Sequence, residues 1–164
     1  MGHGRDTARF HKVGRVSLLI KSPADVERLR AVVGEYRVLL SGADTGGRLA
    51  VVEQILPPGA LGAAPHVHHG HEEDFIVTAG AITFDTATEA RVVAAGGVVS
   101  VPRGAAHGFG NDSAETARCI VTFTPAGYED YFRLIDELVR AGTSPDADTL
   151  ARLRARFATE SATH

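Results

Sequence analysis

Histidines and acids gather in one short segment of the chain, with the spacing of metal ligands. Four of the eight histidines fall within six residues, and three acids follow directly: His66, His68, His69, His71, Glu72, Glu73 and Asp74. Because side chains alternate between the two faces of a strand, His66 and His68 point the same way. Two imidazoles on one face, with a carboxylate close by, can bind one divalent metal ion. This pattern alone leaves an ordinary surface or core role for the histidines equally open.

A second segment places another histidine in a setting rich in glycine and proline. It runs from Gly96 through Pro102 and Gly104 to His107 and Asn111. These five residues match the pattern G(X)5PXG(X)2H(X)3N in full, which is the second motif of the cupin superfamily. The sequence therefore resembles the cupins.

The histidine-rich segment is similar to the first cupin motif, G(X)5HXH(X)3–4E(X)6G. The two histidines, the glutamate and the closing glycine of this motif correspond to His66, His68, Glu73 and Gly80. Ala60 stands where the motif opens with a glycine, and since that glycine serves a turn, the metal ligands are unaffected. The variable spacing makes Glu72 a rival of Glu73, but the fixed distance to Gly80 favours Glu73.

The resemblance covers about residues 36–157 and points to small quercetin-dioxygenase-like cupins. It implies a single jelly-roll barrel, an all-β fold. It also implies one divalent metal ion per chain (Zn, Fe, Ni, Mn, Cu or Co), because imidazole-rich sites bind nearly all these ions. The implied ligands are His66, His68, Glu73 and His107. Flavonol dioxygenases use the motif glutamate as a base, so Glu73 is the implied catalytic residue. Cupins of this kind are often dimers, which predicts a homodimer.

Apolar side chains accompany the implied ligands along the predicted strands. Phe75 and Val77 share a strand face with Glu73, and Phe109 shares one with His107. We therefore expect these three side chains to line a substrate pocket. Such a pocket suits a planar aromatic or apolar small molecule.

Two classes of function are compatible with this site. The first is a metal-dependent enzyme acting on a phenolic, flavonol-like or polyketide-like molecule, as a dioxygenase or as a zinc-type polyketide cyclase of natural-product biosynthesis. The alternative is a non-catalytic cupin that binds a small ligand. The complete set of four implied ligands favours the enzyme, since a binding protein has less need of an open metal ion.

Five further residues are of types that occur in such sites. His69 has the strand parity opposite to His68, which predicts a surface residue. His71 is predicted as a solvated loop residue, with a role as a second base left open. Cys119 is predicted as a buried thiol and Asn111 as a turn residue. Alternation does not decide whether Arg118 faces the pocket or the solvent.

The elements that must position these residues are short strands. Nine apolar runs alternate with marked turns, at residues 36–40, 48–56, 65–69, 74–78, 81–84, 91–94, 98–101, 107–110 and 117–124. Runs of this length and spacing are typical of an all-β sandwich or barrel. The barrel is predicted to span residues 36–125.

The flanking segments are predicted to differ from the barrel. Residues 1–35 would hold a loose arm at 1–12, a strand at 13–20 and a short helix that starts at Ser22 and stops at Gly34. Residues 126–164 would form two helices packed on the barrel. The first carries an apolar stripe from Tyr128 to Val139 and ends at Gly142. The second helix begins at residues 144–145 and extends to Phe157. Its solvated side is predicted to carry Arg152, Arg154 and Arg156.

Composition excludes several other classes of protein. The chain has 164 residues, a formal net charge of −3 and one cysteine. A single cysteine excludes an internal disulfide and a multi-cysteine zinc site. Without a basic excess, nucleic acid is not an expected partner. No apolar run reaches the length of a membrane span and no signal-peptide pattern opens the chain, so we expect a cytoplasmic protein with no membrane partner.

Overall fold

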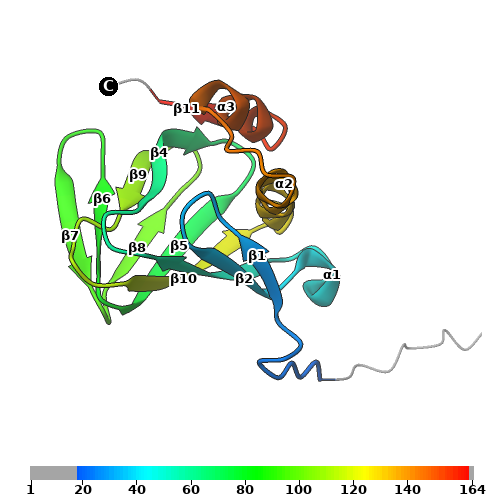
Figure 1. The fold of residues 1–164 in the computed structure, drawn as a ribbon. Coiled ribbons are helices and arrows are strands. Elements are labelled where there is room, and N and C mark those ends of the chain that lie inside the picture. Colours follow the sequence, from blue (N-terminus) through cyan, green and yellow to red (C-terminus); the bar gives the residue numbers. More distant parts are fainter. Residues whose placement is uncertain (1–17, 163–164) are drawn as a thin grey trace, which may run out of the picture.

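Two antiparallel sheets face each other and enclose the buried apolar side chains (Figure 1). The computed structural model describes residues 18–162. The strand order is β1-β2-β3-β10-β5-β8 in the first sheet and β11-β4-β9-β6-β7 in the second. The rings of Phe84 and Phe109 in the second sheet each lie 5.1 Å from Phe75 in the first. These contacts close a jelly-roll barrel and confirm the predicted all-β fold with C-terminal helices.

The strands keep close to the segments that alternation predicts. Their bounds are β1 (Glu27–Arg30), β2 (Glu35–Leu40), β3 (Ala50–Leu56), β4 (Leu61–His68), β5 (Glu72–Ala79), β6 (Ala81–Asp85), β7 (Ala90–Ala94), β8 (Val98–Val101), β9 (Ala106–Gly110), β10 (Ala117–Thr124) and β11 (Thr159–Ser161). In β10, alternate residues from Ala117 to Phe123 are buried, because that face lies against the core.

The helix predicted from Ser22 to Gly34 is wrong, and the segment holds strand β1 instead. Leu29 pairs with Tyr36 of β2 and is buried, whereas Val33 is 49% exposed. The apolar residues of this segment therefore do not form the buried face of a helix. Leu29 is instead buried as part of a hairpin. Gly34 makes the turn with a φ of 95°, a conformation open to glycine. The predicted arm at 1–12 and most of the predicted strand at 13–20 lie outside the described residues.

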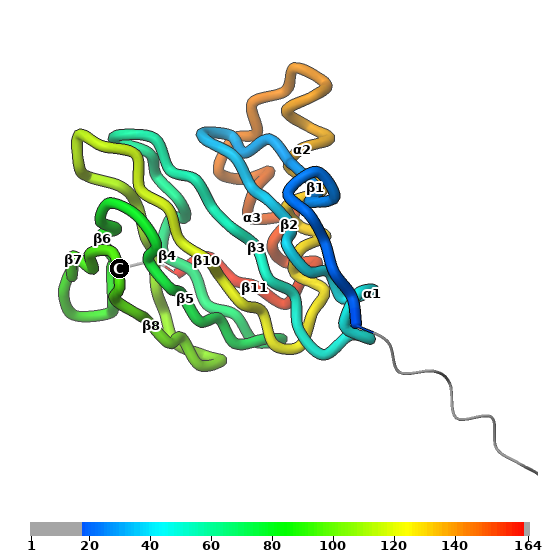
Figure 2. Tube along the Cα trace, turned by 90° about the horizontal axis from the view of Figure 1, so that it is seen from below, coloured from blue at the N-terminus to red at the C-terminus, as the bar shows by residue number. Residues whose placement is uncertain are grey.

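Three helices accompany the barrel: α1 (Gly42–Thr45), α2 (Glu129–Arg140) and α3 (Ala147–Ala155). Figures 1 and 2 both place α2 and α3 at the end of the barrel away from β7. Helix α2 packs on the β1–β2 hairpin, where the Asp136 carboxylate accepts the backbone N–H of Arg30 at 2.7 Å and Phe132 lies 4.4 Å from Tyr36. Helix α3 begins after its cap, Asp146, slightly later than predicted.

Strand β11 follows α3 and adds an edge to the second sheet. Its residue Thr159 pairs with His68 of β4, and Ser161 pairs with His66. The sequence predicted no strand here, because three residues are too few to show alternation. The C-terminal helices and β11 thus lie beside the histidine-rich strand.

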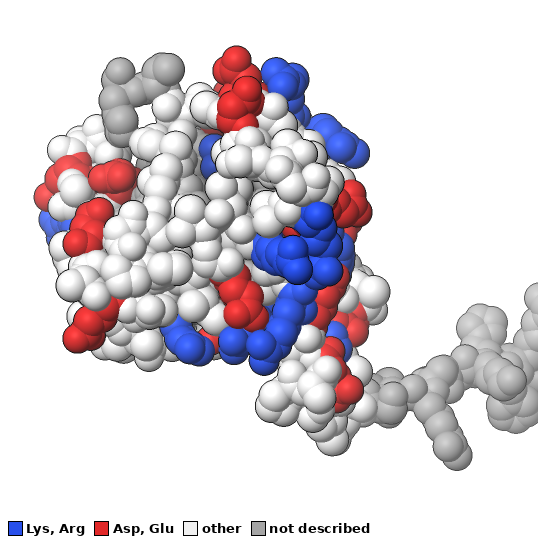
Figure 3. All heavy atoms as spheres, in the orientation of Figure 1, with Lys and Arg blue, Asp and Glu red and all other residues white. Residues whose placement is uncertain are grey.

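Charged side chains on the outer surface are mixed in sign. Figure 3 shows basic side chains gathered over β1 and β2, with acidic side chains among them. Arg37 lies 2.9 Å from Glu35 and 3.1 Å from Glu53, so the basic groups of this face are largely paired. Among residues 18–162, no helix combines the length and apolarity needed to cross a membrane.

Candidate metal centre

Four side chains from three strands meet inside the barrel: His66 and His68 of β4, Glu73 of β5 and His107 of β9. All four are buried, and their ligand atoms lie within 4.8 Å of one another. His66 lies opposite His107 in the β4–β9 pair, and Glu73 comes from the facing sheet. The fold therefore brings together the four residues that the sequence motifs single out.

The ligand atoms of this cluster point toward a common centre. The two Nε2 atoms of His66 and His68 lie 2.8 Å apart. His68 Nε2 lies 3.0 Å from Glu73 Oε1, and His107 Nε2 lies 3.1 Å from Glu73 Oε2. Three imidazole nitrogens and a carboxylate in this arrangement could hold one divalent metal ion.

The outward nitrogens of two rings are fixed by backbone carbonyls. His66 Nδ1 lies 2.8 Å from the carbonyl oxygen of Ala64, and His107 Nδ1 lies 3.3 Å from that of Ala105. A carbonyl only accepts, so Nδ1 carries the proton in each ring. Each Nε2 lone pair is then left for a cation at the centre.

The third ring is fixed by a side chain from the C-terminal strand. His68 Nδ1 lies 2.7 Å from the hydroxyl of Thr159, and that hydroxyl donates to the Phe157 carbonyl at 3.2 Å. Because the hydroxyl proton is used there, Thr159 can accept the Nδ1 proton of His68. No sequence signal identified Thr159, which lies 91 residues from His68.

Burial and mutual contact set the protonation of the cluster. Burial, with the charges of His107 and His68, lowers the pKa of His66 to about 3. Burial also lowers the pKa of His68. It would raise the pKa of Glu73, but the close contacts of its carboxylate with His107, His68 and His71 outweigh burial and hold that pKa well below its ordinary value. His66 and His68 are therefore neutral imidazoles beside an ionised carboxylate, which are the forms that bind metal.

The charge of the cluster also fits a bound cation. Glu73 is buried, and within the described chain only histidines lie within ion-pair distance of its carboxylate. A buried anion that lacks a permanent cation is costly, and a divalent ion at the centre would remove that cost. The donor chemistry and the electrostatics therefore agree.

The prediction that His71 is a solvated loop residue is wrong. His71 is 5% exposed, and its Nε2 lies 3.5 Å from Glu73 Oε1 without a hydrogen bond. Its ring lies 4.5 Å from that of Tyr128 and 5.6 Å from that of Phe123. Tyr128 precedes α2, so the segment that buries His71 comes from a distant part of the chain that local spacing does not reveal.

The rival glutamate points out of the barrel. The Glu72 side chain is 55% exposed and lies 3.9 Å from Arg103. Because neighbours in a strand face opposite ways, one of the two glutamates had to point outward. The structure places Glu73 inside, as the distance to Gly80 indicated.

The three predicted pocket residues are all buried. The Phe75 ring lies 6.2 Å from that of His107. Phe109 lines a small cavity next to His66 and Glu73. Phe75 and Val77 belong to the hydrophobic core instead of facing an open cavity.

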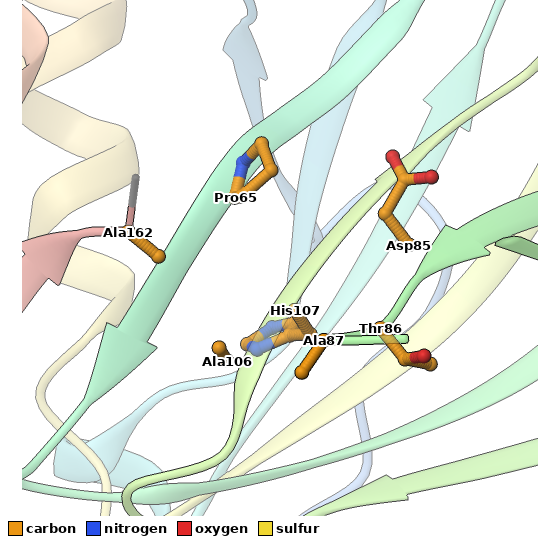
Figure 4. A pocket seen from close by; sticks show the side chains of 7 residues that line it. All are labelled: Pro65, Asp85, Thr86, Ala87, Ala106, His107 and Ala162. Atoms are coloured by element: carbon orange, nitrogen blue, oxygen red, sulfur yellow. The ribbon is translucent and has the colours of Figure 1, made fainter. Parts of the chain in front are cut away.

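Three hollows lie near the cluster. A cavity of about 30 Å³ touches His66 and Glu73 and is also lined by Tyr36, Tyr131 and Arg154. A larger apolar groove of about 500 Å³ lies between β4 and the helices. A third hollow of about 270 Å³ reaches His107 from another side, and Figure 4 shows Pro65 and Ala162 across from Asp85 and Thr86. Its lining residues are Pro65, Asp85, Thr86, Ala87, Ala106, His107 and Ala162.

His69, Asn111, Cys119 and Arg118 lie outside the cluster. The His69 side chain is 50% exposed, as predicted. The Asn111 amide donates to three backbone carbonyls at a turn, also as predicted. Cys119 is a buried thiol whose pKa burial raises to about 12. Arg118 lies on the outer face of β10, 3.7 Å from Glu53.

Arg154 differs from the prediction for its helix. It is 8% exposed and lines the small cavity, whereas Arg152 and Arg156 are exposed. Arg154 follows Leu150 by four residues, so both lie on the face of α3 that packs inward. That spacing is the signal that could have identified it.

Comparison with known proteins agrees with this geometry. The cupin domain model matches residues 52–123. The chain is 30% identical over 103 residues to quercetin 2,3-dioxygenase from Aspergillus japonicus, a match that covers 59% of this chain and 29% of that protein. The chain thus spans well under half the length of this relative.

Two solved structures share the fold. The polyketide cyclase RemF from Streptomyces resistomycificus matches with a TM-score of 0.56 and 23% identity, over 66% of this chain and 80% of that one. A predicted oxalate decarboxylase from Thermotoga maritima matches with a TM-score of 0.57 and 20% identity, over 65% of this chain and 99% of that one. With both motifs in place on a jelly-roll barrel, residues 52–123 of the chain hold a cupin domain.

Proposed function

We propose that this protein is a metal-dependent cupin enzyme that acts on a phenolic, flavonol-like or polyketide-like small molecule. The observation that carries the proposal is the buried cluster of three imidazoles and one carboxylate beside a cavity. The 30% identity to a quercetin 2,3-dioxygenase supports a flavonol-like substrate and a dioxygenase reaction. Redox-neutral cyclisation of a polyketide-like substrate is the other outcome that the test below distinguishes.

His66, His68, Glu73 and His107 would hold the ion, which supplies Lewis-acid chemistry toward a substrate oxygen. Glu73 also lines the small cavity, so its carboxylate would take the proton of a substrate hydroxyl placed there. Its low pKa restricts this role to acidic hydroxyls such as enols and flavonols. Phe109 gives the cavity an apolar wall that keeps water from the reacting oxygen.

The test compares two neighbouring glutamates in the metal-loaded protein. Glu73→Gln keeps the shape of the side chain but removes the base and one anionic ligand, so we expect quercetin turnover to fall by about 100-fold or more. Glu72→Gln is the matched control, because Glu72 points outward, and it should leave turnover within about twofold of wild type. Absorbance of quercetin and an oxygen electrode provide the measurements.

The outcomes separate the candidate functions. Oxygen uptake with ring cleavage supports a dioxygenase, and an isomeric or dehydrated product of a polyketide-like substrate without uptake supports a cyclase. Unchanged turnover in Glu73→Gln would contradict the role of this carboxylate. If no phenolic compound shifts its absorbance in the metal-loaded protein, the non-catalytic binding protein is the better account.

The proposal includes a cytoplasmic homodimer. The buried, unpaired Cys119 is consistent with a reducing compartment. Light scattering on the purified protein gives the oligomeric state, and a mass of about 17.3 kDa would contradict the dimer.

A further inference from the structure

Arg154 is a buried cation at the boundary between two hollows. It lines both the small cavity beside Glu73 and the large apolar groove. Tyr36 and Tyr131 also line both, so the two spaces share a wall. Arg154 therefore stands between the candidate metal centre and the groove that leads outward.

Within residues 18–162, no carboxylate forms an ion pair with Arg154. Seven other arginines in residues 18–162 lie within 4.0 Å of a carboxylate, but Arg154 has none within that distance among the same residues. At 8% exposure it has also lost most of its contact with water. An arginine keeps its charge in proteins, and a buried charge without a partner is destabilising. A ligand anion would remove this cost.

Phenol groups complete the polar surface around Arg154. All three tyrosines of the chain lie at this end of the barrel: Tyr36, Tyr128 and Tyr131. Burial raises the pKa of Tyr36 and Tyr131, and the nearby Arg154 lowers both by a smaller amount. The phenols therefore stay protonated and can donate hydrogen bonds. A guanidinium with neighbouring O–H donors is suited to a carboxylate, which accepts two parallel bonds from arginine.

The groove beyond Arg154 is suited to an apolar body. Its walls include Val33, Leu61, Ile135 and Leu150, and it holds about 500 Å³. A groove of this size can take a ligand of two or three rings. A molecule lying in it would place one end beside Arg154, at the wall that the groove shares with the small cavity.

We propose that Arg154 is a specificity-determining residue that binds a carboxylate on the substrate, so that this cupin prefers a phenolic or polycyclic substrate that carries a carboxylate to the neutral counterpart that lacks it. The inference rests on the proposed function for the reaction itself, but the carboxylate contact needs no metal. Binding to the metal-free protein therefore tests it separately.

The experiment titrates the metal-free full chain with two matched probes, 6-hydroxy-2-naphthoate and 2-naphthol, and follows the probe fluorescence. Wild type should bind the naphthoate about tenfold or more tightly than the naphthol. Arg154→Gln should abolish this difference without weakening 2-naphthol binding. Arg154→Lys, which keeps the charge but not the paired donors, should restore part of it. Arg152→Gln, an exposed arginine on the same helix, is the control and should behave as wild type.

Equal binding of the two probes by wild type would overturn the proposal, as would an undiminished preference in Arg154→Gln. Failure to bind the naphthoate at millimolar concentration would also overturn it. His107→Ala should keep the preference for the naphthoate, because that variant removes a metal ligand and not the carboxylate contact. Loss of turnover with an intact preference would count against the proposed function alone.

Discussion

At the scale of single residues, the Nδ1 atom of each ligand histidine matters as much as the Nε2 atom that faces the metal centre. The Nδ1 contacts to Ala64, Ala105 and Thr159 select one tautomer for each ring and leave the Nε2 atoms free. Two of these acceptors are backbone atoms that a substitution cannot remove. Thr159 is the exception, and its hydroxyl is the point at which ring orientation can be tested.

We predict that Thr159→Val weakens zinc binding about 10- to 100-fold, because His68 loses the acceptor for its Nδ1 proton while the side-chain volume is kept. Competition with a chelator of known affinity measures the change. Thr78→Val, at an exposed position of β5, is the control. Wild-type affinity in Thr159→Val would show that this hydrogen bond does not orient the ring.

The protonation of His66 predicts how the metal-free protein responds to acid. Its pKa is about 3 in the folded chain and near 6.5 when unfolded, so between these values the unfolded chain binds more protons. The free energy of unfolding should therefore be highest above pH 6.5 and fall as the pH drops, by up to about 1.4 kcal/mol per pH unit for this one residue.

Denaturant unfolding between pH 6.5 and 4.5 measures this slope. The pH range does not go below the ordinary pKa of the Glu73 carboxylate. His66→Gln should flatten the slope, and His69→Gln, at an exposed position, should leave it unchanged. A slope that is the same in wild type and His66→Gln would contradict the neutral, buried imidazole.

At the scale of elements, sequence patterns predicted most of what alternation or helical spacing can encode. Strand β10 has the predicted bounds, since its alternate residues are apolar throughout. Strand β1 and the turn after it differ from the predicted helix, because Val26, Leu29 and Val33 also fit helical spacing. Strand β11 was missed because three residues carry no period. Motif spacing predicted the four implied ligands. The positions of His71, Thr159 and Arg154 near the site could not be predicted in this way, because they depend on how the C-terminal segment packs on the barrel.

The β1–β2 turn provides a test of the corrected hairpin. A Cβ at Gly34 would lie 2.2 Å from the carbonyl oxygen of Ile55, in addition to the strain of a positive φ. Gly34→Ala should therefore lower the free energy of unfolding by about 3 kcal/mol or more. Gly59→Ala is the matched control, because Gly59 also has a positive φ but open space around it, and should cost about 1 kcal/mol. Equal losses in the two variants would contradict the close packing of this turn on β3.

At the scale of the whole molecule, the candidate metal centre connects the parts of the fold. The two sheets supply its ligands, β11 fixes one ring, and the segment before α2 covers His71. A ligand that binds only the folded state adds stability, by about 2.7 kcal/mol at a hundredfold excess over its dissociation constant. Metal binding should therefore stabilise both sheets and the C-terminal helices together.

The most direct test is the metal content of the full chain, measured by elemental analysis after purification without added metal. Wild type should hold close to one divalent ion per chain. His66→Ala and His107→Ala should lose most of it and melt at lower temperature, while His69→Ala, which removes an exposed histidine, should keep it. Full metal occupancy in both His66→Ala and His107→Ala would contradict the account, since the ion would then be bound elsewhere.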